Sequence, residues 1–255
     1  MGLRKKIRQF IYRRRFKDYD LKKKKFENHK ILITGTNSGI GLELTKKLIA
    51  MDNLVFAIFN SSSNNLETIK NDNLTLTKCD LSNLGEIDKI KDLLQKNDFD
   101  IIINNAANFG SDNQNVHNTD FDSFSRTINL NALSVLKIIS IILNSKNKGK
   151  NLKKIINISS EMGSINNNKD GNFYIYKTSK SALNSITKNL SNDLFNQNKT
   201  IVFSIHPGSV KSKMNSSGLI SPEICAKNII QMIMDSDNSY NGKFIDLGTN
   251  KEISW

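Results

Sequence analysis

A chain of 255 residues with 38% hydrophobic residues can bury one sizeable core, which indicates a single main domain. Two cysteines, Cys79 and Cys225, exclude a disulfide framework and are typical of reduced thiols in a cytoplasmic protein, and three scattered histidines predict no metal site. The formal net charge of +13 is concentrated in residues 1–25, with twelve basic and two acidic side chains. The nearly neutral remainder argues against a nucleic-acid-binding domain.

Residues 1–26 form a basic extension that precedes the domain predicted over residues 27–255. Four apolar residues follow helical spacing among the cations of this extension: Leu3, Ile7, Phe10 and Ile11. The pattern fits a short basic amphipathic helix that would make peripheral contact with an anionic membrane. It also fits a solvated, partly disordered tail, which is the first interpretation of such a segment, and less well a nucleic-acid arm or a targeting segment.

From residue 30 onward the chain alternates apolar runs with helical periodicity. Buried strands are predicted at 31–33, 54–59, 74–79, 101–103, 155–158, 201–205 and 243–247, and long helices at 121–144 and 176–195. Runs of Val and Ile without polar alternation indicate strands that are buried on both faces. The pattern predicts an α/β fold with a doubly wound parallel sheet of about seven strands flanked by helices. The most apolar run, Val135 to Leu143, contains Lys137 and is too short to span a bilayer.

A glycine-rich turn connects the first predicted strand to the first helix. It reads Thr34-Gly35-Thr36-Asn37-Ser38-Gly39-Ile40-Gly41. Glycines let the backbone approach a ligand closely, and the following helix N-terminus offers free N–H groups to a pyrophosphate. The position of the turn after the first buried strand predicts a Rossmann-type dinucleotide site.

The carboxyl ends of the next strands extend this prediction. The second strand ends at Asn60, where an acidic residue would favour NAD and an arginine would favour NADP. With neither present, NADP or NAD is predicted, with a slight preference for NADP. The third and fourth strands end at Asp80-Leu81 and at Asn105-Ala106-Ala107, where ligands collect in open α/β sheets.

Tyr176 and Lys180 are the candidate chemical groups. Residues i and i+4 share one helix face, so the ammonium is predicted to lie near the phenol and to lower its pKa. Tyr19 and Lys23 have the same spacing in the basic extension, so spacing alone is a weak signal. Placement favours Tyr176 and Lys180, because their helix follows the fifth strand, at whose carboxyl end Ser160 lies. Ser160 would hold a substrate oxygen, or it could merely cap the strand end.

In order and spacing these motifs resemble the short-chain dehydrogenase/reductase family over residues 29–255. The segments Ile158–Ile165 and Tyr176–Asn184 resemble the C-factor and sniffer-like carbonyl reductase branch. The resemblance implies that Tyr176 is the acid–base, that Lys180 binds the nicotinamide ribose, and that Ser160 orients the substrate. It also implies that Asn129 supports a proton-relay water, with Asn131 as the lower-ranked alternative.

The same resemblance implies a set of cofactor contacts. Asp80 would contact the adenine, Asn105 and Ala106 would line the adenosine side, and the loop after the sixth strand would close over the nicotinamide with Pro207, Gly208, Val210 and Ser212. His206 is interpreted as a loop residue and not as a base. Loops 108–120, 166–173 and 213–221 would determine specificity.

The sequence therefore predicts an NAD(P)-dependent oxidoreductase that transfers hydride between nicotinamide and a small carbonyl or alcohol substrate. Family resemblance implies a dimer or tetramer through helices 121–144 and 176–195. The alternative is a catalytically inactive dinucleotide-binding regulatory or scaffold protein, which the intact set of Ser160, Tyr176 and Lys180 disfavours.

Overall fold

The centre of the protein is one eight-stranded sheet. The structure, a computed structural model, describes residues 3–21, 24–61, 64–147 and 149–255. The strands run in the order β10-β9-β8-β7-β4-β1-β2-β3, and all neighbours are parallel except the short β10. They are β1 (Lys30–Thr34), β2 (Leu54–Phe59), β3 (Leu74–Lys78), β4 (Ile101–Asn104), β7 (Lys154–Ile158), β8 (Ile201–His206), β9 (Phe244–Asp246) and β10 (Lys251–Glu252).

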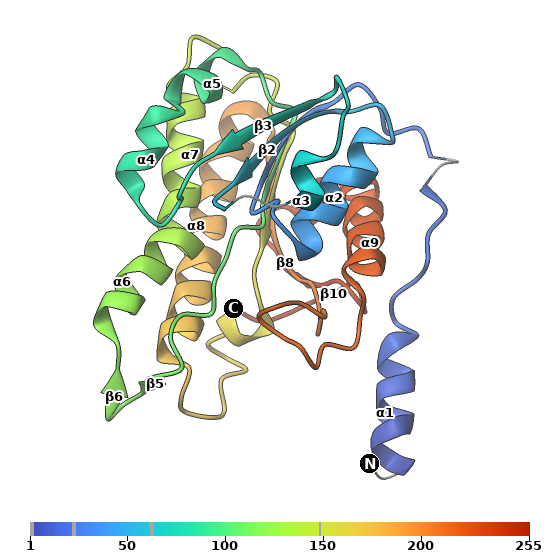
Figure 1. Cartoon of the computed structure of the whole chain (residues 1–255), viewed down its shortest axis with the longest axis vertical. Coiled ribbons are helices and arrows are strands. Elements are labelled where there is room, and N and C mark those ends of the chain that lie inside the picture. Colours follow the sequence, from blue (N-terminus) through green and yellow to red (C-terminus); the bar gives the residue numbers. More distant parts are fainter. Residues whose placement is uncertain (1–2, 22–23, 62–63, 148) are drawn as a thin grey trace.

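Helices cover both faces of this sheet (Figure 1). One face carries α2 (Gly39–Ile49) and α9 (Pro222–Asp235), with α3 (Asn64–Glu67) nearby. The other carries α4 (Leu84–Lys89), α5 (Lys91–Lys96), α7 (Ser134–Leu143) and α8 (Tyr174–Asn198). Smaller elements are α6 (Phe121–Ile128), the hairpin strands β5 (Gln114–Asn115) and β6 (Asn118–Thr119), and the 3₁₀ turns η3 (Glu161–Gly163) and η4 (Asn238–Tyr240).

The predicted fold class is confirmed, since the seven predicted strands correspond to β1, β2, β3, β4, β7, β8 and β9 in a parallel sheet. Central strands are fully buried, and Ile31, Leu32 and Ile33 are all 0% exposed. Alternate residues of one strand enter the two opposite cores, since Leu32 packs with the α7 side and its neighbours with the α2 side. Every side chain of such an unbroken apolar strand is therefore buried, against the helices of one face of the sheet or of the other.

The helical stretch Phe121–Leu143 departs from the expectation that no segment could cross a membrane. It is 23 residues long and apolar enough, by length and composition alone, to pass as a span. Ile138, Ile139 and Ile142 are nevertheless buried against the sheet side of the core, as in the core helix of a globular domain. A π-helical turn, η2 (Asn129–Leu133), separates α6 from α7.

The N-terminal extension begins with the predicted helix, α1 (Leu3–Arg13), which projects from the body of the protein on the side of α9 (Figure 1). Ile7, Phe10 and Ile11 are exposed on it. Phe16, Leu21 and Phe26, in contrast, are at most 9% exposed and belong to the core beside α2 and α9. The extension therefore packs onto the core through Phe16, Leu21 and Phe26. Of the alternative pair Tyr19 and Lys23, Lys23 lies outside the described residues.

Candidate active site

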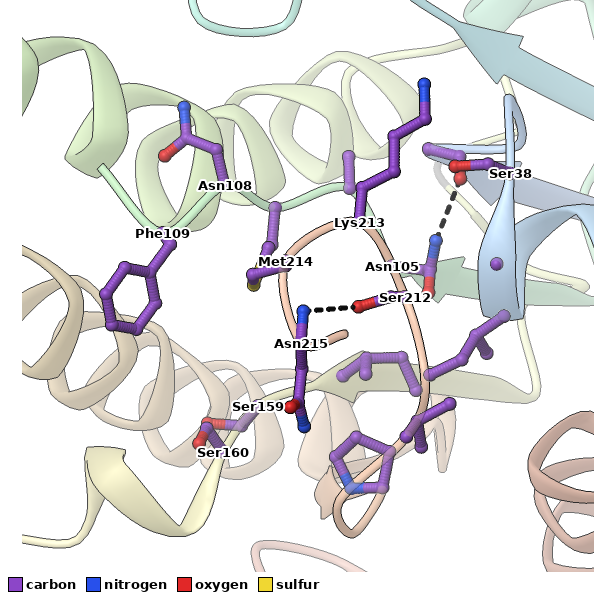
Figure 2. Close-up of a pocket in the computed structure, with 18 of the residues that line it drawn as sticks. Ser38, Asn105, Asn108, Phe109, Ser159, Ser160, Ser212, Lys213, Met214 and Asn215 are labelled. Atoms are coloured by element: carbon purple, nitrogen blue, oxygen red, sulfur yellow. Dashed lines mark hydrogen bonds between the residues drawn. The ribbon is translucent and has the colours of Figure 1, made fainter. Parts of the chain in front are cut away.

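A cavity of about 940 Å³ lies at the carboxyl edge of the sheet. That volume falls within the range of small-molecule sites, roughly 300–1,000 Å³. Figure 2 shows part of its lining, with Ser159 and Ser160 on one side, Ser38 and Asn105 on another, and the loop of Ser212 to Asn215 crossing the opening. Open α/β sheets bind ligands at this edge.

The glycine-rich turn forms one wall of the cavity. Gly35 has φ +70°, and a Cβ there would lie 2.6 Å from Ala106 Cα. A Cβ at Gly41 would lie 2.2 Å from Gly35 O, so both glycines are required by close backbone packing. Gly39 also has a positive φ, +59°, but it faces open space at the helix N-terminus. The turn thus leaves room for a pyrophosphate where the N–H groups of α2 are free.

Two amides hold this turn in place. The Asn105 side chain donates to Thr34 O and to Gly35 O, both at 3.0 Å, which links the end of β4 to the end of β1. The Asn37 side chain accepts the backbone N–H of Asn60 at 3.1 Å and also contacts Ser61, which links the turn to the end of β2. Asn60 is therefore positioned at the cavity as predicted.

The two serines after β7 have different partners. Ser159 is buried and its hydroxyl donates to Asn184 Oδ1 at 2.7 Å. Ser160 lines the cavity, accepts the N–H of Met162 at 3.2 Å, and makes a side-chain hydrogen bond with Tyr176. The geometry places Ser160, the second serine, beside the phenol, although its hydroxyl also caps the η3 turn.

Tyr176 lies in the first turn of α8, where backbone N–H groups lack intrahelical acceptors. Gln114 accepts the N–H of Tyr176 at 3.0 Å, and its amide donates to Phe109 O at 2.9 Å. The Phe109 and Tyr176 rings also lie 4.8 Å apart. Gln114 and Phe109 thereby join loop 108–114 to the start of α8 and fix the phenol at the cavity. Neither residue was predicted individually as a site residue, although both lie in loop 108–120, which was predicted to determine specificity.

Lys180 is buried one turn further along α8, at 2% exposure, and its Nζ donates to Ile158 O at 2.8 Å. Burial lowers the pKa of Lys180 to about 7. Burial also raises the pKa of Tyr176 to about 12, which the hydrogen bond with Ser160 only partly offsets. The expected lowering of the phenol pKa by the ammonium is thus not found here, because desolvation dominates both groups.

Asn129 does not join this site, contrary to the prediction. Its side chain donates to Ser82 O at 3.2 Å and does not line the cavity. Asn131, ranked lower, is buried and does not line the cavity either, but it links loop 108 to α8, because it accepts the N–H of Asn108 and donates to Ser179 Oγ at 2.9 Å. The π-helical turn explains the error, since its wider turn changes which side chain faces α8.

Most predicted cofactor residues do line the cavity. They are Gly35, Asn37, Ser38, Gly39, Ile40, Asn60, Leu81, Asn105, Ala106, Ala107, Tyr176, Lys180, Pro207, Gly208, Val210 and Ser212. Two do not: Gly41 packs beneath the turn, and the Asp80 carboxylate accepts from Ser82 N at 3.0 Å and Ser82 Oγ at 2.8 Å. Asp80 therefore shapes the turn after β3, and the predicted adenine contact has no support in this geometry.

His206 and Tyr12 are among the lining residues that were not predicted as site residues. His206 is the last residue of β8 rather than part of the following loop, and its Nδ1 accepts the N–H of Glu161 at 3.1 Å. Burial lowers its pKa, which favours the neutral ring and a structural role over an ion pair with Glu161. Tyr12, from the extension, also lines the cavity, and no motif in the sequence indicates this.

The sheet order, the glycine turn and the cavity at the strand ends together define a dinucleotide-binding protein of the Rossmann class. The short chain dehydrogenase family model matches residues 29–219. The chain therefore belongs to the short chain dehydrogenase family.

Individual relatives agree with this assignment. The chain is 31% identical to the C-signal protein of Myxococcus xanthus over 159 residues, 61% of this chain and 92% of that protein. It is 30% identical to a fatty acyl-CoA reductase of Acinetobacter baylyi over 220 residues, 80% of this chain and 72% of that protein. The carbonyl reductase Sniffer of Drosophila melanogaster superposes with a TM-score of 0.79 at 28% identity, covering 90% of this chain and 100% of that one.

A chicken fatty liver carbonyl reductase with bound NADPH superposes with a TM-score of 0.78 at 22% identity and shares the fold. It covers 90% of this chain and 100% of its own. The protein is thus an oxidoreductase of the short chain dehydrogenase family with a fold of carbonyl-reductase type, which confirms the predicted enzyme class.

The buried Lys180 makes stability depend on pH. Its pKa is about 7 in the folded chain against an ordinary value of 10.5, so between these values the unfolded chain binds one proton more. The free energy of unfolding should rise with pH across that window. The melting temperature of the wild type, relative to that of Lys180→Met, should therefore increase from pH 7 to pH 10.

Lys188→Met, on an exposed position of the same helix, serves as the control and should show no such trend. Equal pH profiles for Lys180→Met and Lys188→Met would contradict a buried lysine with a lowered pKa.

Proposed function

We propose that the protein catalyses reversible hydride transfer between NADP(H) and a carbonyl or alcohol, with Tyr176 as the acid–base. The observation that carries this proposal is the convergence of Ser160, Tyr176 and Lys180 on one cavity with the glycine turn. A nicotinamide bound against the Pro207 loop would supply or accept the hydride. Ser160 would orient the substrate oxygen beside the phenol, and Tyr176 would donate its proton to that oxygen.

The raised pKa of Tyr176 bears on the direction of reaction. With a pKa of about 12 the phenol is protonated at neutral pH, which is the form that donates a proton in carbonyl reduction. Lys180 would reach the nicotinamide ribose from the floor of the cavity, where it is held by Ile158 O. Asn131 would position loop 108 against α8 through its contacts with Asn108 and Ser179.

Tyr176→Phe should lower kcat for NADPH-dependent reduction of a panel of ketones and aldehydes by at least about 100-fold, because general acid catalysis contributes that much or more. Consumption of NADPH measures the rate, and calorimetric titration should show unchanged NADPH affinity. Tyr174→Phe, at a half-exposed tyrosine two residues earlier, is the matched control.

A Tyr176→Phe variant that keeps full turnover would reject this role. The scaffold function would be favoured by two results together: the wild type binds NADPH but reduces no carbonyl, and Tyr176→Phe retains the biological effect of the wild type.

The preference for NADP rests on Asn60. A carboxylate at this position would repel the 2′-phosphate of NADP, whereas Asn60 carries no charge and is fixed by Asn37 at the cavity. We expect NADP to bind more tightly than NAD, and Asn60→Asp to weaken NADP at least about tenfold while NAD binding is retained. Thermal shifts with each cofactor measure both effects, and a wild type that prefers NAD would contradict the assignment.

Attachment to an anionic membrane is proposed for α1. Ile7, Phe10 and Ile11 are 48%, 61% and 55% exposed, and Arg13 and Arg14 continue the same helix end. Exposed apolar side chains beside cations suit the interface of an anionic bilayer. The protein would then be cytoplasmic with a peripheral membrane contact.

Replacing Phe10 and Ile11 by Asp should abolish cosedimentation with phosphatidylserine vesicles, while Ile165→Asp, at another exposed apolar residue, should not. Equal sedimentation of the two variants would reject the membrane contact.

Assembly into a homo-oligomer remains a prediction. Phe121, Leu133 and Leu136 are exposed on the helical stretch Phe121–Leu143, which supports an interface through the predicted helices. The molecular mass of the protein in solution would distinguish a monomer from a dimer or tetramer.

A further inference from the structure

The N-terminal extension contacts the loop that would cover the nicotinamide. Tyr12, in the last turn of α1, accepts the backbone N–H of Ser209 through its hydroxyl oxygen at 2.7 Å. Arg13 Nε donates to Leu219 O at 3.1 Å. Ser209 lies at the start of the loop and Leu219 at its end, so two consecutive residues of the extension bind both of its sides.

These two contacts meet at the narrow base of the loop. Ser209 O accepts the N–H groups of Leu219 and Ile220 at 2.7 and 3.0 Å, and Val210 pairs with Ile220 as an isolated bridge. The intervening residues Ser212 to Asn215 extend over the cavity from this base (Figure 2). Anything that tightens the base therefore restricts the part of the loop that covers the cavity.

Phe16 anchors the extension beside this base. A Cβ at Gly208, whose φ is +83°, would lie 2.6 Å from Phe16 Cζ, and one at Gly248 would lie 2.9 Å from Phe16 Cε2. The ring of Phe16, whose side chain is 8% exposed, therefore packs directly against two glycines from separate loops. Tyr12 packs on Phe16 with the ring centroids 5.9 Å apart, so the phenol and the seated ring act together.

A second set of contacts fixes the extension to α9. The Asn228 side chain accepts the N–H of Lys17 at 3.1 Å and donates to Lys17 O at 2.7 Å, and Asp18 forms an ion pair with Lys227. One side-chain amide thus pairs with both the N–H and the C=O of Lys17, as a neighbouring strand would, and this fixes the position of the segment. The segment that carries Tyr12 is therefore held at two places, by the loop through Tyr12 and by α9 through Lys17 and Asp18.

We propose that residues 12–18 are a clamp of the cofactor site, in which Tyr12 and Phe16 hold the base of loop 209–220 closed over the bound dinucleotide. Tyr12 is a positioning residue in this scheme, because it acts through Ser209. The clamp lies outside residues 29–219, the part that the family model matches, so it is a device of this chain added to the family site. The proposal rests on dinucleotide binding and not on the chemistry of Tyr176.

The first test removes one atom. Tyr12→Phe keeps the ring and deletes the acceptor of the Ser209 N–H, so amide hydrogen exchange of the segment around 209–220 should accelerate in the full chain. NADPH should bind about fivefold more weakly, the effect of one ordinary hydrogen bond. Tyr19→Phe, in the same extension but away from the cavity, is the matched control.

The second test displaces the ring from outside the cavity. Gly248→Ala places a methyl group against Phe16 without altering a residue that lines the site, and it should change exchange and NADPH affinity in the same direction as Tyr12→Phe. Gly171→Ala, where a Cβ meets nothing within 4 Å, is its control and should leave both unchanged.

The outcomes separate the clamp from its alternatives. Unchanged exchange and affinity in both variants would overturn the proposal, and tighter NADPH binding would overturn it too, by showing that the segment competes with the cofactor. If the wild type fails to bind NADPH, the proposed function itself fails. If binding is normal and only the variants are without effect, the function stands and the clamp is rejected.

Discussion

The close approach of two chain segments at the carboxyl edge of the sheet is the constraint on which the site depends. Gly35 and Ala106 are so near that a single Cβ would bring atoms to 2.6 Å, and Asn105 adds hydrogen bonds to Thr34 O and Gly35 O. This contact sets the glycine turn directly beside the end of β4. It thereby decides where the free N–H groups of α2 point and where loop 108–114 begins.

From that edge a chain of polar contacts leads to the chemical group. Asn131 holds Asn108, Gln114 holds both Phe109 O and the N–H of Tyr176, and the rings of Phe109 and Tyr176 lie together. The hydrogen bonds among these contacts satisfy backbone groups of Asn108, Phe109 and Tyr176 that would otherwise need another partner. The phenol is therefore positioned by the same loop that follows the cofactor wall, so the binding site and the acid–base share one framework.

Burial shifts the pKa values of the two titratable groups in opposite directions, because one is charged when protonated and the other when deprotonated. It disfavours the ammonium of Lys180 and the phenolate of Tyr176 alike, which leaves both side chains neutral over much of the range between pH 7 and 12. An argument from helical spacing treats the pair as if it were in water, where a cation favours a nearby phenolate. Spacing predicts their proximity well, but the sign of the pKa shift depends on how much protein surrounds them.

The amino-acid sequence by itself determined the buried strands, the glycine turn and the placement of Tyr176 and Lys180 on one helix face, because hydrophobic runs and short-range spacing encode buried strands and helix faces directly. Only the tertiary structure decided that Asn131 rather than Asn129 faces α8, since a π-helical turn alters the register without any marker residue. It also decided that Tyr12 reaches the cavity from 197 positions away in sequence from Ser209. Contacts over such separations depend on shape and packing between distant segments, and local patterns do not record them.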